Sequence, residues 1–303
     1  MSQHLFQLSE EVASALDAGR AVVALESTVI AHGLPRPLNM ETARRLERAV
    51  RGAGAIPATV AILGGRVRVG LSEAELERVG RGEGVRKVSR RDLAAVVADG
   101  LDGATTVATT AWVAARAGLN VFATGGIGGV HRGNTSDVSA DLPELARTSI
   151  VVVCSGAKIV LDLGATREWL ETYGVTVVGY GCDEMPAFYT RRSGLPVDAR
   201  ADTPSEVARL FEARRALDLE GALLVTVPVP EDDETDAALV EEVLSEALHE
   251  AGRRNVAGRE LTPFLLARMG ERTGGATLKS NVALLENNAR VAAEIAVAVA
   301  ARS

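Results

Sequence analysis

Short apolar runs alternate with longer amphipathic segments along the chain, and this alternation predicts an α/β fold. The clearest apolar runs are Ala21–Leu25, Asn120–Ala123, Ile150–Cys154, Val175–Gly179 and Ala222–Pro228. Runs that are apolar on both faces are typical of buried parallel strands. Segments with helical periodicity separate them: Ser9–Ala18, Asn39–Val50, Thr109–Ala117, Arg167–Thr172, Thr203–Leu217, Asp232–Ala251, Thr262–Met269 and a long helix after Gly275. The pattern favours helices packed on a largely parallel sheet, and we treat residues 1–303 as one domain.

Two local signals refine this picture. Gly64-Gly65 separates the apolar runs Pro57–Leu63 and Arg66–Val69, which is typical of a β-hairpin with a two-residue turn. Asn39 precedes a helical pattern and is expected to be the N-cap of that helix.

Composition and charge narrow the class of partner. The chain has 303 residues, of which 47% are hydrophobic and only 3% aromatic, so the core is expected to consist mainly of Ala, Val and Leu. The formal net charge of −7 argues against a nucleic-acid partner, which needs a basic face. A small phosphorylated ligand needs only a few local donors and stays compatible with this charge.

The location of the protein can also be predicted. Cys154 and Cys182 are the only cysteines, without a metal-ligand spacing, so buried thiols and a cytoplasmic protein are expected. Met1–Arg20 lacks the basic start and apolar run of a secretory signal. No apolar stretch approaches the roughly 20 residues needed to cross a bilayer, so no membrane partner is expected.

The stretch Val121–Val160 carries the most candidate chemistry. Its two apolar runs break abruptly into glycine and small polar residues, and ligands of open α/β sheets bind where strands give way to such loops. The first loop, Thr124–Gly133, contains five glycines among ten residues, together with His131. Glycine lets backbone N–H groups approach a ligand closely, which suits phosphate.

Lys158 follows the second apolar run and has two interpretations. A lysine at the start of a helix is usually a solvated cation. Lys158, however, lies between Val151–Cys154 and Ile159–Leu161. A lysine in apolar surroundings tends to lose its proton, and the neutral amine attacks carbonyl carbon, so a Schiff-base role is the alternative.

Glu26 and His32 follow the first apolar run. A carboxylate in partly apolar surroundings has a raised pKa and can act as a general acid, whereas Glu26 could equally cap a loop or pair with an arginine. His32 either orients a phosphate or satisfies a loop carbonyl.

Three further groups of residues are candidates. The basic cluster within Val85–Leu93 is either a solvated face or a phosphate site. Phe188 and Tyr189 stack on a planar base, cover an active site or belong to a packed loop. Asn281 and Asn288 are seven residues apart on one face of the last helix, where each faces a ligand, a buried carbonyl or solvent.

Taken in order, several stretches together resemble the pseudouridine-5′-phosphate glycosidase family, which includes indigoidine synthase A-like proteins. The resemblance runs from about Ala24 to Ala289, and the ordered set of stretches is specific although each one alone is weak. The stretches are ALESTVIAHGLPRP, IPATVAIL, VRKVSRRDL, GATTVATT, FATGGIGGVHRG, DVSADLPEL, VVCSGAKIVLDLGAT, MPAFY, TPFLL and SNVALLENNA.

The resemblance implies a single-domain α/β/α sandwich, a homotrimer and a divalent metal, usually Mn²⁺. It also implies site residues: Lys158 is the nucleophile and Glu26 the proton donor. Asp137 corresponds to the metal ligand, with Asp141 as the other candidate. Substrate-binding positions by similarity are Lys87, Val107, Ser139, Ala140 and Asp141, and we add Thr124, His131, Asn281 and Asn288 as candidate substrate contacts.

The implied reaction is the reversible cleavage of pseudouridine 5′-phosphate to uracil and ribose 5-phosphate, catalysed by a lyase. Because a carbon–carbon bond breaks, a lysine Schiff base that serves as an electron sink suits the chemistry better than a pair of carboxylates. The rivals are another Schiff-base sugar-phosphate lyase, which would release no uracil, and a sugar-phosphate sensor, which would bind without turnover. A nucleotide-dependent oxidoreductase is disfavoured, because the GGIGG run lacks the GxGxxG spacing.

Overall fold

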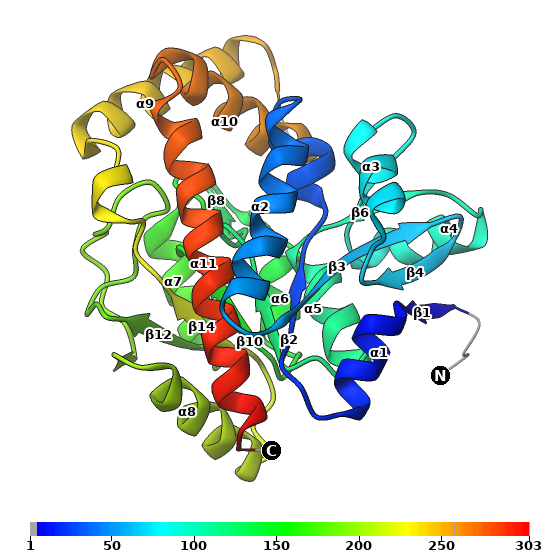
Figure 1. Ribbon diagram of the computed structural model, residues 1–303. Coiled ribbons are helices and arrows are strands. Elements are labelled where there is room, and N and C mark those ends of the chain that lie inside the picture. The colour runs from blue at the N-terminus through cyan, green and yellow to red at the C-terminus, as the bar shows by residue number, and fades with distance from the viewer. Residues whose placement is uncertain (1–4, 257, 303) are drawn as a thin grey trace.

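The computed structural model describes residues 5–256 and 258–302, and its centre is a mostly parallel β-sheet with helices on both faces (Figure 1). The strand order is β1-β4-β3-β2-β7-β10-β14-β12-β13, with β6 paired to β3 and β5 paired to β6. These strands are β1 (Phe6–Leu8), β2 (Val22–Leu25), β3 (Ile56–Leu63), β4 (Arg66–Val69), β5 (Arg86–Val88), β6 (Gly103–Thr105), β7 (Val121–Ala123), β10 (Val151–Cys154), β12 (Thr176–Tyr180), β13 (Ala199–Ala201) and β14 (Leu223–Thr226).

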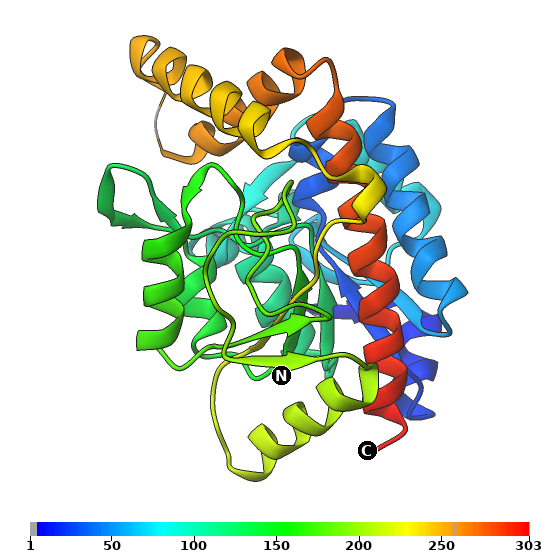
Figure 2. The ribbon, with the colours of Figure 1, turned by 90° about the vertical axis from the view of Figure 1, so that its left-hand side faces the viewer.

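Helices cover the two faces of this sheet, so that the predicted three-layer α/β/α architecture is confirmed (Figure 2). One face carries α2, α8 and α11, and α5, α6 and α7 lie on the other (Figure 1). The helices are α1 (Glu10–Asp17), α2 (Leu38–Gly52), α3 (Glu73–Arg81), α4 (Leu93–Ala98), α5 (Val107–Arg116), α6 (Asp141–Leu145), α7 (Leu163–Thr172), α8 (Pro204–Ala216), α9 (Ala237–Arg253), α10 (Leu261–Arg272) and α11 (Ala276–Ala300). No helix within the described ranges has the length and apolarity that crossing a bilayer requires.

The position of the central strands in the fold explains why their sequences are uniformly apolar. Every residue of β2, β7, β10 and β14 is buried, because helices cover both faces of the sheet at this point. The register sets Leu25 beside Ala123 and Ala123 beside Val153 in parallel strands. Glu26 and Thr124, the residues that follow β2 and β7, therefore emerge side by side at the carboxyl edge.

The predicted hairpin is confirmed in detail. Strands β3 and β4 are antiparallel, and Leu63 pairs with Arg66 across the turn. Gly64 and Gly65 have φ angles of 56° and 74°, which L side chains rarely adopt. At Gly65 a Cβ would also lie 2.6 Å from the Val97 carbonyl oxygen.

The prediction that Asn39 caps its helix was wrong. The helix α2 begins at Leu38 with Pro37 as its N-cap, which places Asn39 inside the first turn. Its buried amide instead donates hydrogen bonds to the carbonyls of Ile30 (2.8 Å) and Gly80 (3.0 Å). Asparagine, a residue typical of helix caps, therefore serves here to bind backbone carbonyls outside the helix.

Two other boundaries differ because of caps that the periodicity did not reveal. The hydroxyl of Thr106 accepts a hydrogen bond from the Thr109 backbone, so α5 begins at Val107. The expected helix Asp232–Ala251 is divided into a 3₁₀ turn and α9, because Asp236 caps the latter.

A second, three-stranded sheet formed where a loop was expected. It consists of β8 (Val130–His131), β9 (Asn134–Val138) and β11 (Leu161–Asp162), in the order β11-β8-β9. All its pairings are antiparallel, and it joins the loops that follow β7 and β10.

Candidate active site

Glu26 and Lys158, the predicted acid and nucleophile, lie together at the carboxyl edge of the sheet. The hydroxyl of Thr124 donates a hydrogen bond to the Glu26 carboxylate. Lys158 follows β10 after a short turn, and its Nζ donates to the carbonyl of Gly126 at 2.5 Å. Both side chains are only partly exposed, and the charge of Lys158 acts on Glu26. The structure thus brings a carboxyl group and an amine into one electrostatic environment.

The surroundings of Glu26 favour its protonated form. Burial raises the pKa of Glu26, while the Lys158 ammonium and the Thr124 hydrogen bond oppose the shift. The nearby carboxylate of Asp141 raises this pKa further. A carboxyl group that keeps its proton above its ordinary pKa is suited to act as a general acid.

A second lysine shares this environment. Burial lowers the pKa of Lys87, on β5, and the charge of Lys158 lowers it further, whereas Asp141 and Glu26 oppose the shift. The third lysine of the chain, Lys279, has a side chain that is 71% exposed. Two of the chain's three lysines therefore lie in the site. The side chains of Lys87 and Lys158 are both partly buried.

Asp141 ties three segments of the site together. One carboxylate oxygen accepts a hydrogen bond from the backbone N–H of Ala108 (2.9 Å), in the first turn of α5, and the other accepts one from Gly128 (2.8 Å). The Ser139 hydroxyl accepts from the backbone N–H of Asp141 at 3.3 Å. Asp141 is 7% exposed, so both its oxygens are used by the protein itself. Next to it, Val107 begins α5, where first-turn N–H groups lack helical partners.

The glycine loop is shaped by close contacts with protein neighbours. A Cβ on Gly126 would lie 2.7 Å from the Phe188 ring, and one on Gly128 would lie 2.2 Å from the Ser139 hydroxyl. Backbone hydrogen bonds join this loop to the next one, since Ile127 donates to the Gly156 carbonyl. These glycines are needed because neighbouring side chains leave no room for a Cβ. The sequence had indicated only a role in phosphate binding.

The aromatic pair belongs to a packed loop. Phe188 and Tyr189 are each 2% exposed, with ring centroids 4.7 Å apart. The arginines of the basic cluster, Arg86, Arg90 and Arg91, are all exposed, and Arg90 forms an ion pair with Glu144.

Glu144 was missed by the sequence analysis. Its side chain is 2% exposed and forms an ion pair with Arg90 at 2.6 Å, and it accepts a hydrogen bond from the Thr148 hydroxyl. The pair joins α6, which carries Asp141, to the segment after β5, which carries Lys87. The signal in the sequence was an acidic residue between Pro143 and Leu145, in a short segment that also contains Leu142.

The two asparagines of α11 both face inward. Asn288 is fully buried and hydrogen-bonds to buried carbonyls, one of the alternatives considered above. Asn281 is 7% exposed, and its amide makes no hydrogen bond with the residues that the structure describes.

The small sheet carries the remaining candidates. His131 on β8 and Asp137 on β9 are partly exposed, and Ala140 precedes α6. Residues 5–256 and 258–302 contain no cluster of three His, Cys, Asp or Glu side chains that could hold a metal ion alone. Asp137 offers a single carboxylate.

The two cysteines carry free thiols. Cys154 is fully buried within β10, and burial raises its pKa to about 12, which makes it unreactive. The predicted buried thiol is confirmed for Cys154, whereas Cys182 is partly exposed.

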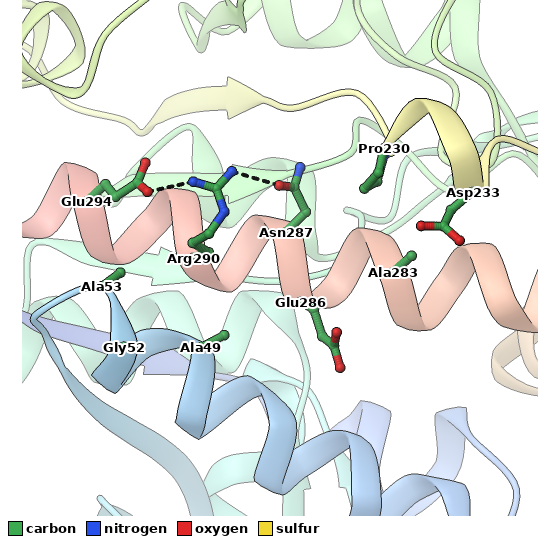
Figure 3. A pocket seen from close by; sticks show the side chains of 10 residues that line it. All are labelled: Ala49, Gly52, Ala53, Pro230, Asp233, Ala283, Glu286, Asn287, Arg290 and Glu294. Carbon is green, nitrogen blue, oxygen red and sulfur yellow. Dashed lines mark hydrogen bonds and ion pairs between the residues drawn. The ribbon is translucent and has the colours of Figure 1, made fainter.

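One surface groove lies away from these residues. It has a volume of about 550 Å³ and runs between α2 and α11 (Figure 3). Its lining residues are Ala49, Gly52, Ala53, Pro230, Asp233, Ala283, Glu286, Asn287, Arg290 and Glu294. None of the candidate site residues lines it.

Comparisons with known proteins show which family the chain belongs to. The sequence profile described as "Indigoidine synthase A like protein" matches residues 11–298. The chain belongs to the indigoidine synthase A-like family. The family assignment made from the ordered motifs is therefore confirmed.

Relatives in this family carry a functional name. A protein named pseudouridine-5′-phosphate glycosidase in Caldanaerobacter subterraneus subsp. tengcongensis is 53% identical to this chain, and the match covers 96% of this chain and 95% of that protein. A protein of the same name in Streptomyces griseus subsp. griseus is 54% identical, and the match covers 97% of this chain and 92% of that protein.

Solved structures of similar proteins share the indigoidine synthase A-like fold. The prealnumycin C-glycosynthase AlnA in complex with ribulose 5-phosphate superposes with a TM-score of 0.92 at 42% identity, covering 100% of this chain and 99% of that one. An indigoidine synthase A-like protein from Thermotoga maritima gives 0.91 at 41%, covering 99% and 98%.

Proposed function

We propose that this chain catalyses the reversible cleavage of the carbon–carbon glycosidic bond of pseudouridine 5′-phosphate, which with water gives uracil and ribose 5-phosphate. One observation carries the proposal. An acid and an amine, Glu26 and Lys158, share the carboxyl edge of the sheet in a chain 53% identical to a protein named for this activity.

Lys158 supplies the electron sink that this bond cleavage needs. Its neutral Nζ bonds to C1′ of the sugar while the bond between C1′ and the ring oxygen breaks; the ring oxygen takes up a proton and the newly bonded nitrogen releases one. The nitrogen lone pair that this leaves then forms a C=N⁺ bond as the bond from C1′ to C5 of the base breaks, and the base leaves with the electrons of that C–C bond and takes a proton at C5. Water hydrolyses the iminium, which frees ribose 5-phosphate and the lysine.

Glu26 supplies the proton. In this mechanism its carboxyl group protonates the sugar ring oxygen or the departing carbon of the base. Burial raises the pKa of Glu26, which supports this role. A general acid contributes about 10²- to 10⁴-fold to the rate, so the covalent route and substrate anchoring must supply the larger share.

Other residues hold the substrate in the same proposal. The cation of Lys87 and the free first-turn amide at Val107 attract the phosphate and polar sugar oxygens. The amide of Asn281 is available to the base. Further proposed contacts are Thr124, His131, Ser139 and Ala140, whereas the expected contact of Asp141 is not kept because both its oxygens accept backbone hydrogen bonds.

We propose Asp137 as the ligand of a divalent cation such as Mn²⁺. A hard carboxylate oxygen suits this ion, and Asp137 would hold it through its side chain. The alternative ligand, Asp141, is disfavoured because backbone N–H groups already occupy both its oxygens. When bound, the ion would neutralise phosphate charge.

Location and assembly are part of the proposal. We propose a cytoplasmic homotrimer, and light scattering should then give three times the chain mass of 31.7 kDa. A mass of one or two chains would contradict the trimer.

The activity can be tested directly. The purified protein is incubated with pseudouridine 5′-phosphate and Mn²⁺, and uracil and ribose 5-phosphate are quantified by chromatography. Equal amounts of both products support the proposal. Lys158→Ala should release no uracil while keeping the circular dichroism spectrum of the wild type, and Lys279→Ala is the matched control. No uracil from the wild type would reject the function.

A C-glycosynthase that acts on another acceptor is the second candidate. The similarity to prealnumycin C-glycosynthase favours it, at 42% identity. The same lysine adduct would then be captured by a different carbon nucleophile. Synthesis of pseudouridine 5′-phosphate from uracil and ribose 5-phosphate, measured in the same experiment, distinguishes the two.

A further inference from the structure

One buried amide connects the two loops that carry the proposed acid and nucleophile. Asn288 lies in α11, which packs across the ends of β7 and β10, and its side chain is 0% exposed. Its Nδ2 donates to the carbonyls of Thr124 (2.9 Å) and Gly125 (3.3 Å) and contacts the Ser155 hydroxyl at 3.1 Å. Its Oδ1 lies 3.3 Å from the same hydroxyl. The amide therefore has no free donor to offer a ligand.

The partners of Asn288 are immediate neighbours of the reacting groups. Thr124 donates its hydroxyl hydrogen bond to the carboxylate of Glu26. Gly125 precedes Gly126, whose carbonyl accepts the hydrogen bond from Lys158. Ser155 begins the short turn that ends at Lys158, so a displacement of either loop changes the separation between the acid and the amine.

We propose that Asn288 is a positioning residue that fixes the loop after β7 against the loop after β10, and thereby sets the separation of Glu26 and Lys158 without touching substrate. This role rests on the function proposed above. It replaces direct substrate contact, which we had expected for Asn288.

Neither aspartate nor alanine satisfies these contacts. In an aspartate, an oxygen would face the carbonyls of Thr124 and Gly125, and like partial charges would repel. In alanine, two carbonyls would lose a buried donor. Carboxylate and methyl replacements therefore both separate the loops, although for different reasons.

The adjacent residue provides a matched control. Asn287 lies on the outer side of α11, where its Oδ1 accepts a hydrogen bond from Arg290 at 2.9 Å (Figure 3). Asn287→Ala removes an asparagine amide from the same helix without contacting either loop. It should keep wild-type kinetics.

The test compares Asn288→Ala, Asn288→Asp and Asn287→Ala in uracil release across pH. Misplacing reacting groups by about 1 Å costs on the order of 10²-fold, so kcat of both Asn288 variants should fall about 10- to 100-fold while KM changes less than about threefold. The alkaline limb of the profile should also move to higher pH, because a displaced Thr124 no longer lowers the pKa of Glu26.

Each outcome decides the proposal. Folded Asn288→Ala with wild-type kcat and an unmoved pH profile would overturn it, and so would a raised KM with unchanged kcat, which indicates substrate contact. If both Asn288 variants fail to fold, Ser155→Ala removes one partner with little loss of volume, and it must show the same kcat and pH effects. An inactive wild type would reject the proposed function and this role with it.

Discussion

The proton of Glu26 gives the most detailed prediction. Glu26→Gln keeps the shape of the side chain and an oxygen that can accept the Thr124 hydrogen bond, but it removes the acid. Since a general acid contributes about 10²- to 10⁴-fold, kcat should fall by that factor, or about 2.8–5.6 kcal/mol at about 1.4 kcal/mol per tenfold. In the wild type, activity should decline as pH rises through the raised pKa of Glu26. This limb should be absent from Glu26→Gln.

The same substitution should change stability with a defined sign. Because burial raises the pKa of Glu26 above 4.5, the folded state binds its proton more tightly than the unfolded state. Its contribution to stability is complete below the unfolded pKa and is lost as pH rises through the folded pKa, and it amounts to about 1.4 kcal/mol for each tenfold difference in proton affinity between the two states. Glutamine does not titrate, so the difference in free energy of unfolding between variant and wild type should increase across this window.

Glu47 is a control with matched physical chemistry. It is also partly buried, burial raises its pKa, and its carboxylate accepts a hydrogen bond from the Thr59 hydroxyl at 2.7 Å. Glu47→Gln should reproduce the pH dependence of stability but keep full activity. Denaturant unfolding and steady-state kinetics across pH provide both readouts. Glu26→Gln with wild-type kcat, or with an unchanged alkaline limb, would refute the assignment.

Two further predictions concern groups around the site. Arg90→Met leaves the buried carboxylate of Glu144 without its cation. Because the Arg90 side chain is itself partly exposed, this should cost about 1–3 kcal/mol in the free energy of unfolding, whereas Arg91→Met at an exposed position should cost less than about 0.5 kcal/mol. Equal losses in denaturant unfolding would contradict this. Asp137→Ala should weaken Mn²⁺ binding in titration calorimetry by at least about tenfold, and EDTA should then have the same effect on wild-type activity as the substitution; undiminished Mn²⁺ affinity would show that Asp137 is not the ligand.

The sequence predicts what depends on local patterns. The buried strands were recognisable because residues covered on both faces must all be apolar. Gly64 and Gly65 marked the hairpin because both positions need positive φ. Glu26 and Lys158 were identifiable as candidates because each closely follows such a strand, and parallel strands end at a common edge.

Features that depend on partners distant in the sequence were not predicted. Asn39 has the chemistry of a cap, but its partners are carbonyls of Ile30 and Gly80, which only the folded chain brings near. The small sheet pairs residues of β8 with those of β11, and each strand is too short to leave a periodic signal. Likewise, the role inferred for Asn288 depends on loops more than 130 positions earlier in the chain.

The identity of the nucleophile is tested most directly by trapping. The chain has three lysines, so mass spectrometry of peptides after borohydride reduction with ribose 5-phosphate has few sites to distinguish. We predict that the reduced sugar adduct is found on Lys158 and is absent from Lys279. An adduct on Lys87 instead, or no adduct from an enzyme that releases uracil, would contradict the account.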